Sequence, residues 1–223
     1  MFDIRPIIHS AIYVEVGGKS LYFDPFHLTD SKSKLSMALD SADIVLITHD
    51  HYDHFSPLDI KLIIKEDTKI VMPSSMKAIY EDSIINELID YSNVYYVKPN
   101  DSIQIGDISI LAVPSYNVGK TFHISDKKYV GYIVSYNGES IYVAGDTDIN
   151  DDNINIKCDI ALLPVGGTYT MNSTEAAKLA NTIRPKIVYA THYGDIVGVS
   201  GADGDGEAFK KLVDKDIEVI LPY

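Results

Sequence analysis

The chain is poor in cysteine and in basic residues, and it has no long apolar run. Cys158 is the only cysteine among 223 residues, which excludes an internal disulfide framework and makes a reducing cytoplasm the expected location. No apolar stretch reaches the roughly 18 residues that span a bilayer. The first residues, MFDIRPIIHSAIYVEV, alternate like a strand and carry no basic head before an apolar segment. We therefore expect neither a signal peptide nor a membrane partner.

Basic residues are outnumbered by acidic ones. The chain has 19 Lys and Arg against 32 Asp and Glu, which gives a net charge of −13. The longest basic clusters are pairs such as Lys127-Lys128 and Lys210-Lys211. Such a chain repels the phosphates of nucleic acids, so nucleic acid is not an expected partner. Solubility accounts for the negative charge.

Sequence features that would separate domains are also missing. No low-complexity tract, no short repeat and no linker rich in Pro, Gly or Ser interrupts the chain. Hydrophobic residues make up 46% of it, which is enough for one large core or two half-cores. We expect a single domain over residues 1–223.

The first half of the chain alternates between strand and helix patterns. Gly17-Gly18 is a hairpin turn signal between strands at 11–16 and 20–26. Further strands are expected at 43–48, 68–73, 93–97, 102–106 and 107–115, and helices at 57–65 and 75–91.

The second half repeats this alternation. Asn137-Gly138 is a strong hairpin signal, and buried-type strands at 159–165 and 186–192 flank a helix at 173–183. Asn172 and Glu175 suit a capping box, and a helix at 205–216 and a strand at 217–222 end the chain. The fold class expected is α/β, a four-layer αββα sandwich with two mixed sheets face to face and helices outside. A doubly wound parallel sheet is the alternative, but the hairpins count against it.

The stretch ITHDHYDHFSP, residues 47–57, contains three of the seven histidines within six positions. It follows an apolar strand and ends at Ser56-Pro57, a helix-start signal, so it lies where α/β proteins place ligands. Residues two apart in an extended chain share a face, so His49 and His51 can serve one spot, with Asp53 and His54 serving another nearby. Imidazole and carboxylate are ligands for zinc, manganese or iron. Chance gives such a pattern with a probability on the order of 10⁻³.

Additional ligands must come from elsewhere in the chain. Asp146 follows an apolar strand and a glycine, and its carboxylate can bridge two cations, although an ordinary polar turn also explains GDTD. His192 comes just after a buried-type strand, where a lone histidine is more often structural. His123 is the only histidine between Phe55 and Gly145.

This order of His49, His51, Asp53, His54, His123, Asp146 and His192 resembles the metallo-β-lactamase superfamily over essentially the whole chain. The phrases IHSAIYVE, YFDPF, AGDTD and LLPVGGTYTM are similar to a branch of small metal-dependent hydrolases akin to L-ascorbate-6-phosphate lactonase. The resemblance implies an αββα sandwich of two pseudo-equivalent halves with the site at one edge of the sheets.

The resemblance also implies two divalent metal ions, with zinc as the first choice and manganese or iron as alternatives. One ion would be held by His49, His51 and His123, and the other by Asp53, His54 and His192. Asp146 would bridge the ions, and Asp24 would orient the histidine loop from behind.

The chain departs from the superfamily's pattern at one ligand. The third-motif histidine of many relatives directly follows a strand, but here that place reads VPSYN, with Asn117, and His123 comes six residues later. Cys158 is not where some subclasses use a cysteine ligand, and we interpret it as a core residue.

The implied reaction is hydrolysis. Two cations about 3.5–4 Å apart lower the pKa of a shared water, and the bridging hydroxide attacks a carbonyl or phosphorus centre. Asp53 and Asp146 are the expected catalytic carboxylates, because Asp53 can relay a proton while it coordinates. No GxSxG serine nucleophile is present. The substrate expected is a small ester, lactone or phosphoester, and a homo-oligomer is left open.

Five residues are candidates for supporting or substrate-binding roles. Asp24 ends an early strand, and His9 occupies a place near the site in similar proteins, although a structural role is equally compatible. Thr168 and Tyr169 belong to GGTY, which can offer N–H groups to an anion or form a tight turn. Tyr193 contacts either substrate or core.

Other functions compete with a small-molecule hydrolase. An RNA-processing nuclease uses the same ligands, but the acidic charge argues against it. A flavodiiron-like module would carry the pattern His-x-Glu-x-Asp, whereas here the place of the glutamate is taken by His51. A non-catalytic metal-binding protein is the remaining alternative.

Overall fold

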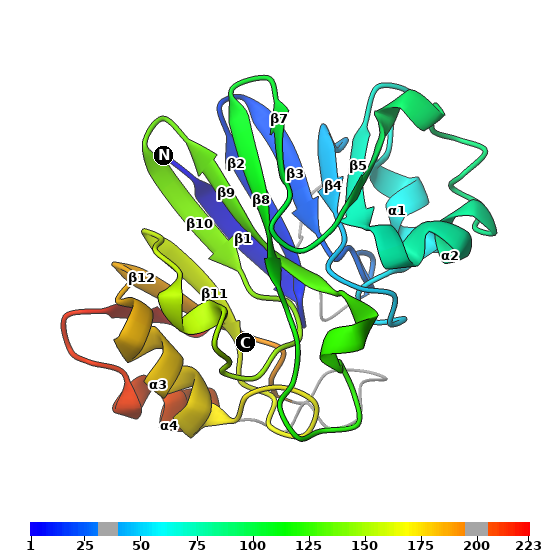
Figure 1. The fold of residues 1–223 in the computed structure, drawn as a ribbon. Helices are drawn as coiled ribbons and strands as arrows, with labels where there is room; N and C mark the ends of the chain where they lie inside the picture. Colours follow the sequence, from blue (N-terminus) through cyan, green and yellow to red (C-terminus); the bar gives the residue numbers. More distant parts are fainter. Residues whose placement is uncertain (31–39, 195–204) are drawn as a thin grey trace. The chain divides into compact units, whose positions relative to one another are not determined.

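The computed structural model describes residues 1–30, 40–194 and 205–223, which form two compact units, residues 1–98 and 99–223. Each unit contains one mixed β-sheet with its own helices (Figure 1). None of the helices in these ranges is long and apolar enough to cross a membrane.

The first unit has a six-stranded sheet. Its strands follow one another across the sheet in chain order, and they are β1 (Asp3–Ile8), β2 (Ala11–Val16), β3 (Lys19–Phe23), β4 (Ile44–Leu46), β5 (Lys69–Pro73) and β6 (Val94–Val97). β1, β2 and β3 pair antiparallel, and β3 to β6 pair parallel. The helices are α1 (Pro57–Ile63) and α2 (Lys77–Glu81), with 3-10 turns at Ser74–Met76 and Tyr91–Asn93.

The hairpin between β2 and β3 and the start of α1 form as the sequence predicts. Gly17 and Gly18 have φ of 60° and 70°, the conformation that a two-residue hairpin needs at both positions. Ser56 caps α1, with Pro57 in its first turn. The Asp59 carboxylate accepts hydrogen bonds from Ser56 Oγ at 2.6 Å and from the backbone N–H groups of His27 and Leu28 at 3.0 and 2.9 Å. Asp59 therefore ties the loop after β3 to the start of α1.

The helix predicted over 75–91 is wrong for most of its length, because α2 ends at Glu81. Ser83 donates both its backbone N–H and its hydroxyl to Tyr80 O, and the Asn86 amide donates to Glu81 O. Short polar side chains that bind nearby carbonyls compete with helical hydrogen bonds, which explains the early end.

The second unit has a seven-stranded sheet whose strands again follow chain order. They are β7 (Ser102–Ile105), β8 (Ile108–Pro114), β9 (Val130–Tyr136), β10 (Glu139–Val143), β11 (Ile160–Pro164), β12 (Ile187–Thr191) and β13 (Glu218–Ile220). β7 to β10 pair antiparallel, and β10 to β13 pair parallel. The helices are α3 (Ser173–Ile183) and α4 (Gly206–Leu212), with 3-10 turns at Ser125–Lys127 and Asn153–Asn155.

Helices α3 and α4 lie against each other and share one apolar core with β11 and β12 (Figure 1). Leu179 and Ile183 of α3 and Phe209 of α4 are buried with Leu163 of β11. The predicted capping box of α3 is confirmed, since Asn172 Oδ1 accepts from the backbone N–H of Glu175, whose carboxylate accepts from the N–H of Asn172. The helix predicted over 205–216 is shorter and ends at Leu212.

The two units repeat one plan of strand pairing. In each, an antiparallel hairpin leads into a strand that begins a parallel run: Gly17-Gly18 joins β2 to β3, and Asn137-Gly138 joins β9 to β10. Parallel strands end at the same edge of a sheet. Residues that follow β3 and β4 in the first unit, and β10, β11 and β12 in the second, are therefore neighbours within their unit.

Candidate metal centre

The histidine loop of the first unit joins β4 to α1. The backbone N–H groups of His54 and Phe55 both donate to His51 O, at 3.0 and 2.8 Å, which closes the loop into a turn. The ring centroid of His49 lies 4.6 Å from that of His51 and 4.0 Å from that of His54. His49 and His54 are buried and His51 is half-buried. The turn thus gathers three imidazoles that the sequence places within six positions.

Asp24, at the end of β3, supports this loop from inside. Its Oδ1 accepts from the Thr48 N–H at 2.7 Å, and its Oδ2 lies 2.6 Å from Thr48 Oγ1 and 2.7 Å from His54 Nδ1. Burial raises the pKa of Asp24, and the charge and hydrogen bond of His54, with the donors of Thr48, oppose that rise. The three hydrogen bonds that the carboxylate accepts favour its ionised form.

These contacts select the tautomers of two histidines. Because Asp24 accepts from His54 Nδ1–H, the neutral ring of His54 has its lone pair on Nε2. The single hydroxyl proton of Thr48 is directed to Asp24, so Thr48 Oγ1 accepts from His49 Nδ1–H at 2.9 Å. His49 and His54 therefore both present Nε2 as a donor atom for a cation.

His9 lies in the turn between β1 and β2 and contacts the same loop. His9 Nε2 is 3.1 Å from Asp53 Oδ2, and His54 Nε2 is 3.8 Å from that oxygen. His9 and Asp53 are both buried. The structure thus brings His9, whose role the sequence leaves open, to a carboxylate of the predicted ligand set.

The second unit contributes a separate group of donors around Asp146. Asp146 Oδ2 is 3.3 Å from His123 Nε2 and 3.1 Å from His192 Nε2. All three side chains are buried. Asp146 follows β10 and His192 follows β12, so the edge of the parallel strands brings them together, while His123 comes from the loop between β8 and β9.

This donor set fits a divalent cation. A tetrahedral ion with bonds of about 2.0–2.1 Å separates its ligand atoms by about 3.3 Å, which the two nitrogen–oxygen distances at Asp146 match. Asp146, His123 and His192 all belong to the ligand set that the resemblance implies.

Gly166 leaves room for His192. A Cβ at Gly166 would lie 2.5 Å from His192 O and 2.9 Å from His192 Nδ1, closer than side chains approach. Gly167 N–H donates to Met171 O and Thr168 N–H donates to Gly166 O, at 3.0 and 3.2 Å. These N–H groups are used inside the loop, which favours the tight turn over the anion cradle.

Three remaining candidates have different surroundings. Thr168 is exposed, and Tyr169 is half-buried with its carbonyl near His123. Tyr193 is buried in the core of the second unit, and its hydroxyl exchanges hydrogen bonds with Tyr223 O and N at 3.1 and 3.2 Å. Packing accounts for Tyr193, so the structure favours the core reading over a substrate contact.

Sequence reasoning missed Thr48 and Asn117 as contacts of the donor histidines His49 and His123. Thr48 looks like an ordinary β-branched strand residue, and its role depends on Asp24, which lies 24 positions earlier. Asn117 is noted only as a departure from a pattern. Its contacts reach Tyr169, 52 positions later, a separation over which no local pattern carries a signal.

Comparison with known proteins supplies the family context. The profile of the family described as "Beta-lactamase superfamily domain" matches residues 3–192. A UPF0173 metal-dependent hydrolase of Pyrococcus furiosus is 32% identical over 230 residues, covering 99% of this chain and 96% of that protein. Another, of Methanopyrus kandleri, is 30% identical over 224 residues, covering 96% and 93%.

Solved structures that are similar to this chain include further proteins described as metal-dependent hydrolases. A protein of Parabacteroides distasonis assigned as a metal-dependent hydrolase is 32% identical with a TM-score of 0.78, covering 99% of this chain and 92% of that one. A protein of Thermotoga maritima, described as a Zn-dependent hydrolase of the metallo-β-lactamase superfamily, has 19% identity and a TM-score of 0.65, covering 99% and 98%. CmlA, a diiron β-hydroxylase of Streptomyces venezuelae, has 16% identity and a TM-score of 0.72, covering 98% and 52%. With the two mixed sheets, these similarities confirm the predicted αββα sandwich.

Proposed function

Because the chain belongs to the β-lactamase superfamily and to its UPF0173 metal-dependent hydrolases, we propose that it hydrolyses a small ester, lactone or phosphoester with two divalent metal ions. The observation that carries the proposal is the position of Asp146 Oδ2, 3.3 and 3.1 Å from the Nε2 atoms of His123 and His192. The resemblance to L-ascorbate-6-phosphate lactonase makes lactones the first substrates to try.

The proposed ligands keep the assignments made from the sequence. His49, His51 and His123 would hold one ion, Asp53, His54 and His192 would hold the other, and Asp146 would be shared between them. Bound divalent ions lower the pKa of a water molecule and polarise the substrate oxygen. Zinc is proposed first, since histidine and carboxylate ligands suit it, and iron or manganese are the alternatives.

The chain's own residues orient these donors and move the proton. Asp24 and Thr48 hold His49 and His54 with Nε2 presented, through contacts of 2.6–2.9 Å. His9 Nε2, 3.1 Å from Asp53 Oδ2, can take a proton from that carboxylate or return it. Burial of these groups excludes bulk water, which strengthens their electrostatic interactions.

The test is metal content and turnover measured on the same samples. Wild type, His123→Ala, His192→Ala and His27→Ala are loaded with zinc, dialysed and analysed for metal per chain. Each is then assayed with bis-p-nitrophenyl phosphate and a panel of lactones. His27 is the control because it lies outside the proposed ligand set.

We expect about two metals per chain in the wild type and in His27→Ala, with metal content and turnover reduced in the other two variants. Metal without turnover on either class of substrate would favour a non-catalytic metal-binding protein. Binding to RNA that weakens steeply with salt would favour the nuclease. Absence of bound metal after loading would overturn the proposal.

A further inference from the structure

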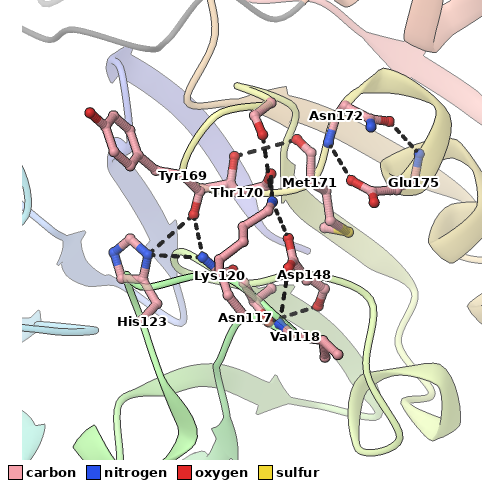
Figure 2. Close-up of polar contacts among 12 residues, drawn as sticks. Asn117, Val118, Lys120, His123, Asp148, Tyr169, Thr170, Met171, Asn172 and Glu175 are labelled. Atoms are coloured by element: carbon pink, nitrogen blue, oxygen red, sulfur yellow. Dashed lines mark hydrogen bonds and ion pairs between the residues drawn. The ribbon is translucent and has the colours of Figure 1, made fainter.

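Asn117 lies in the loop between β8 and β9, and its side chain contacts the segment that carries His123. Its Nδ2 lies 2.6 Å from Tyr169 O, 3.1 Å from Phe122 O and 3.3 Å from His123 Nδ1. The backbone N–H of Asn117 also donates to His123 O at 2.8 Å. Figure 2 shows Asn117, His123 and Tyr169 converging in this way. Asn117 is buried, so these contacts are made away from solvent.

Counting hydrogens decides which of these contacts are hydrogen bonds. An amide –NH₂ has two protons, and two carbonyl oxygens, those of Phe122 and Tyr169, lie within reach of Asn117 Nδ2. The reverse orientation of the amide would place its oxygen against both carbonyls. Both protons of Asn117 are therefore committed, and none is left to donate to His123 Nδ1.

The same count fixes the tautomer of His123. Its Nδ1 lies 3.2 Å from Tyr169 O, which can accept only from a protonated nitrogen. A carbonyl oxygen has two lone pairs, so Tyr169 O accepts from both Asn117 and His123. The neutral ring of His123 thus carries its proton on Nδ1 and its lone pair on Nε2, the atom 3.3 Å from Asp146 Oδ2.

Lys120 fixes the segment that carries these carbonyls. Its Nζ donates to Asp148 Oδ1 and to Thr170 O, both at 2.6 Å, and makes a long contact of 3.5 Å with Gly167 O. Asp148 is buried and also accepts from the Val118 N–H at 3.0 Å. The ammonium group of Lys120 therefore joins the loop of residues 115–124 to the loop of residues 166–171 (Figure 2).

We infer that Asn117 and Lys120 are positioning residues that hold His123 in its Nδ1–H tautomer and present Nε2 towards Asp146. With the ring neutral, Nε2 and Asp146 Oδ2 are two acceptor atoms 3.3 Å apart, which repel each other unless a proton or a metal ion lies between them, so this arrangement suits a bound cation. The tautomer follows from the contacts alone, while its use in metal binding rests on the proposed function.

The first measurement is the tautomer of His123 in metal-free wild type. A long-range ¹H–¹⁵N spectrum of imidazole nitrogens at about pH 8, where histidine is neutral in solution, separates the two tautomers. His123→Gln identifies the signal. We expect protonated Nδ1 and unprotonated Nε2. A predominant Nε2–H form, or an imidazolium, would overturn the inference whatever the metal content.

The second measurement compares zinc affinity of folded variants, by competition with a chelator. Asn117→Leu removes both amide protons at similar side-chain size, and Lys120→Met removes the ammonium group. Asn155→Leu is the matched control, because exposed Asn155 donates to Asp151 O at 2.8 Å within the same unit. Loss of an outer ligand partner typically weakens metal binding about 10–100-fold, which we expect for the first two variants and not for the control.

The outcomes separate positioning from a purely structural role. Asn117→Leu and Lys120→Met should also give mixed tautomers of His123 in the metal-free spectrum. A lower Tm with an unchanged tautomer and unchanged zinc affinity would make both residues structural and overturn the inference. Protonated Nδ1 in the wild type with unchanged zinc affinity in His123→Gln would leave the tautomer established and refute His123 as a ligand.

Discussion

Histidines in strained backbone mark both groups of donors. His9, His123 and His192 have φ of 55°, 55° and 53°, and Asp24 has φ of 45°. Residues other than glycine seldom adopt this left-handed conformation, which costs of order 1–3 kcal/mol per residue and is concentrated at functional sites. His9, Asp24 and His192 each directly follow a strand, so the sharp change of direction turns the side chain towards the other donors of its unit, while His123 lies in the loop between β8 and β9.

The space for His192 depends on Gly166. We expect Gly166→Ala to lower stability by roughly 1–3 kcal/mol, because the new methyl group overlaps His192 O and Nδ1. The same displacement should weaken metal retention. Thermal unfolding and metal analysis would check both effects, with Thr168→Ala, an exposed change in the same loop, as the control. Full metal retention and wild-type Tm in Gly166→Ala would contradict this prediction.

The half-buried thiol of Cys158, which packs against the core of the second unit, should react slowly in the folded protein. Burial, with the charge of Asp159, raises its pKa to about 12, so the thiolate fraction at pH 8 is lower than in the unfolded chain by a factor on the order of 10³. Reaction with Ellman's reagent should be slow without urea and fast in urea, and the native rate should rise about tenfold per pH unit. Equal rates in both conditions would refute the core assignment of Cys158.

At the scale of elements, strand ends are held together by polar groups as well as by the sheet. Asp159, just before β11, accepts from Ser140 N–H at 2.9 Å in β10 and from Lys186 Nζ at 2.7 Å before β12. The hydrogen bond from Lys186 is the largest cause that lowers the pKa of Asp159. Asp159 therefore links the beginnings of three neighbouring strands, β10, β11 and β12. The other ends of these strands lead to Asp146, Gly166 and His192.

Asp159→Asn should lower stability in a pH-dependent way. Because the folded pKa lies below the unfolded value of about 3.9, the stabilisation is complete above about pH 4 and is lost as the pH falls through the folded pKa. Urea unfolding should show a loss of about 1 kcal/mol at pH 7 that shrinks in acid. Asp126→Asn, at an exposed position, is the control. A loss that stays constant from pH 7 down to pH 3 would contradict the assignment.

At the scale of the whole molecule, the repeated plan of the two units accounts for where the donors occur in the sequence. His9 lies between β1 and β2 as His123 lies between β8 and β9, and Asp24 follows β3 as Asp146 follows β10. The segments that follow the next strand of each unit differ: the histidine loop follows β4, whereas Gly166 and Gly167 follow β11. Equivalent positions thus carry supporting residues in the first unit and proposed ligands in the second.

Metal removal should destabilise the whole protein. An ion that binds only the folded state contributes about 2.7 kcal/mol at a free concentration of 100 Kd, and for a chain of this length Tm should fall by roughly 5–10 °C when it is removed. Scanning calorimetry with and without a chelator, followed by added zinc, would measure the shift. The double variant His123→Ala/His192→Ala should show a much smaller shift. An unchanged Tm in chelated wild type would argue against metal ions as part of the folded state.

The sequence by itself determined the hairpins at Gly17-Gly18 and Asn137-Gly138, the caps of α1 and α3, and the family. These signals are local: the φ values that two glycine-rich turns require, a side chain that caps its own helix, and ligands crowded into one stretch. The family follows from that stretch, because His49, His51, Asp53 and His54 stand at fixed spacing in one turn.

Only the tertiary structure decided how the donors are supported. The tautomers of His49, His54 and His123 depend on Asp24 and Tyr169, each at least 24 positions away from the histidine it contacts. Tertiary contacts also placed Tyr193 in the core and brought His9 to Asp53. Sequence patterns report the backbone conformation of neighbouring residues. Which nitrogen of a histidine carries a proton is decided by an acceptor that the fold brings from a distant part of the chain.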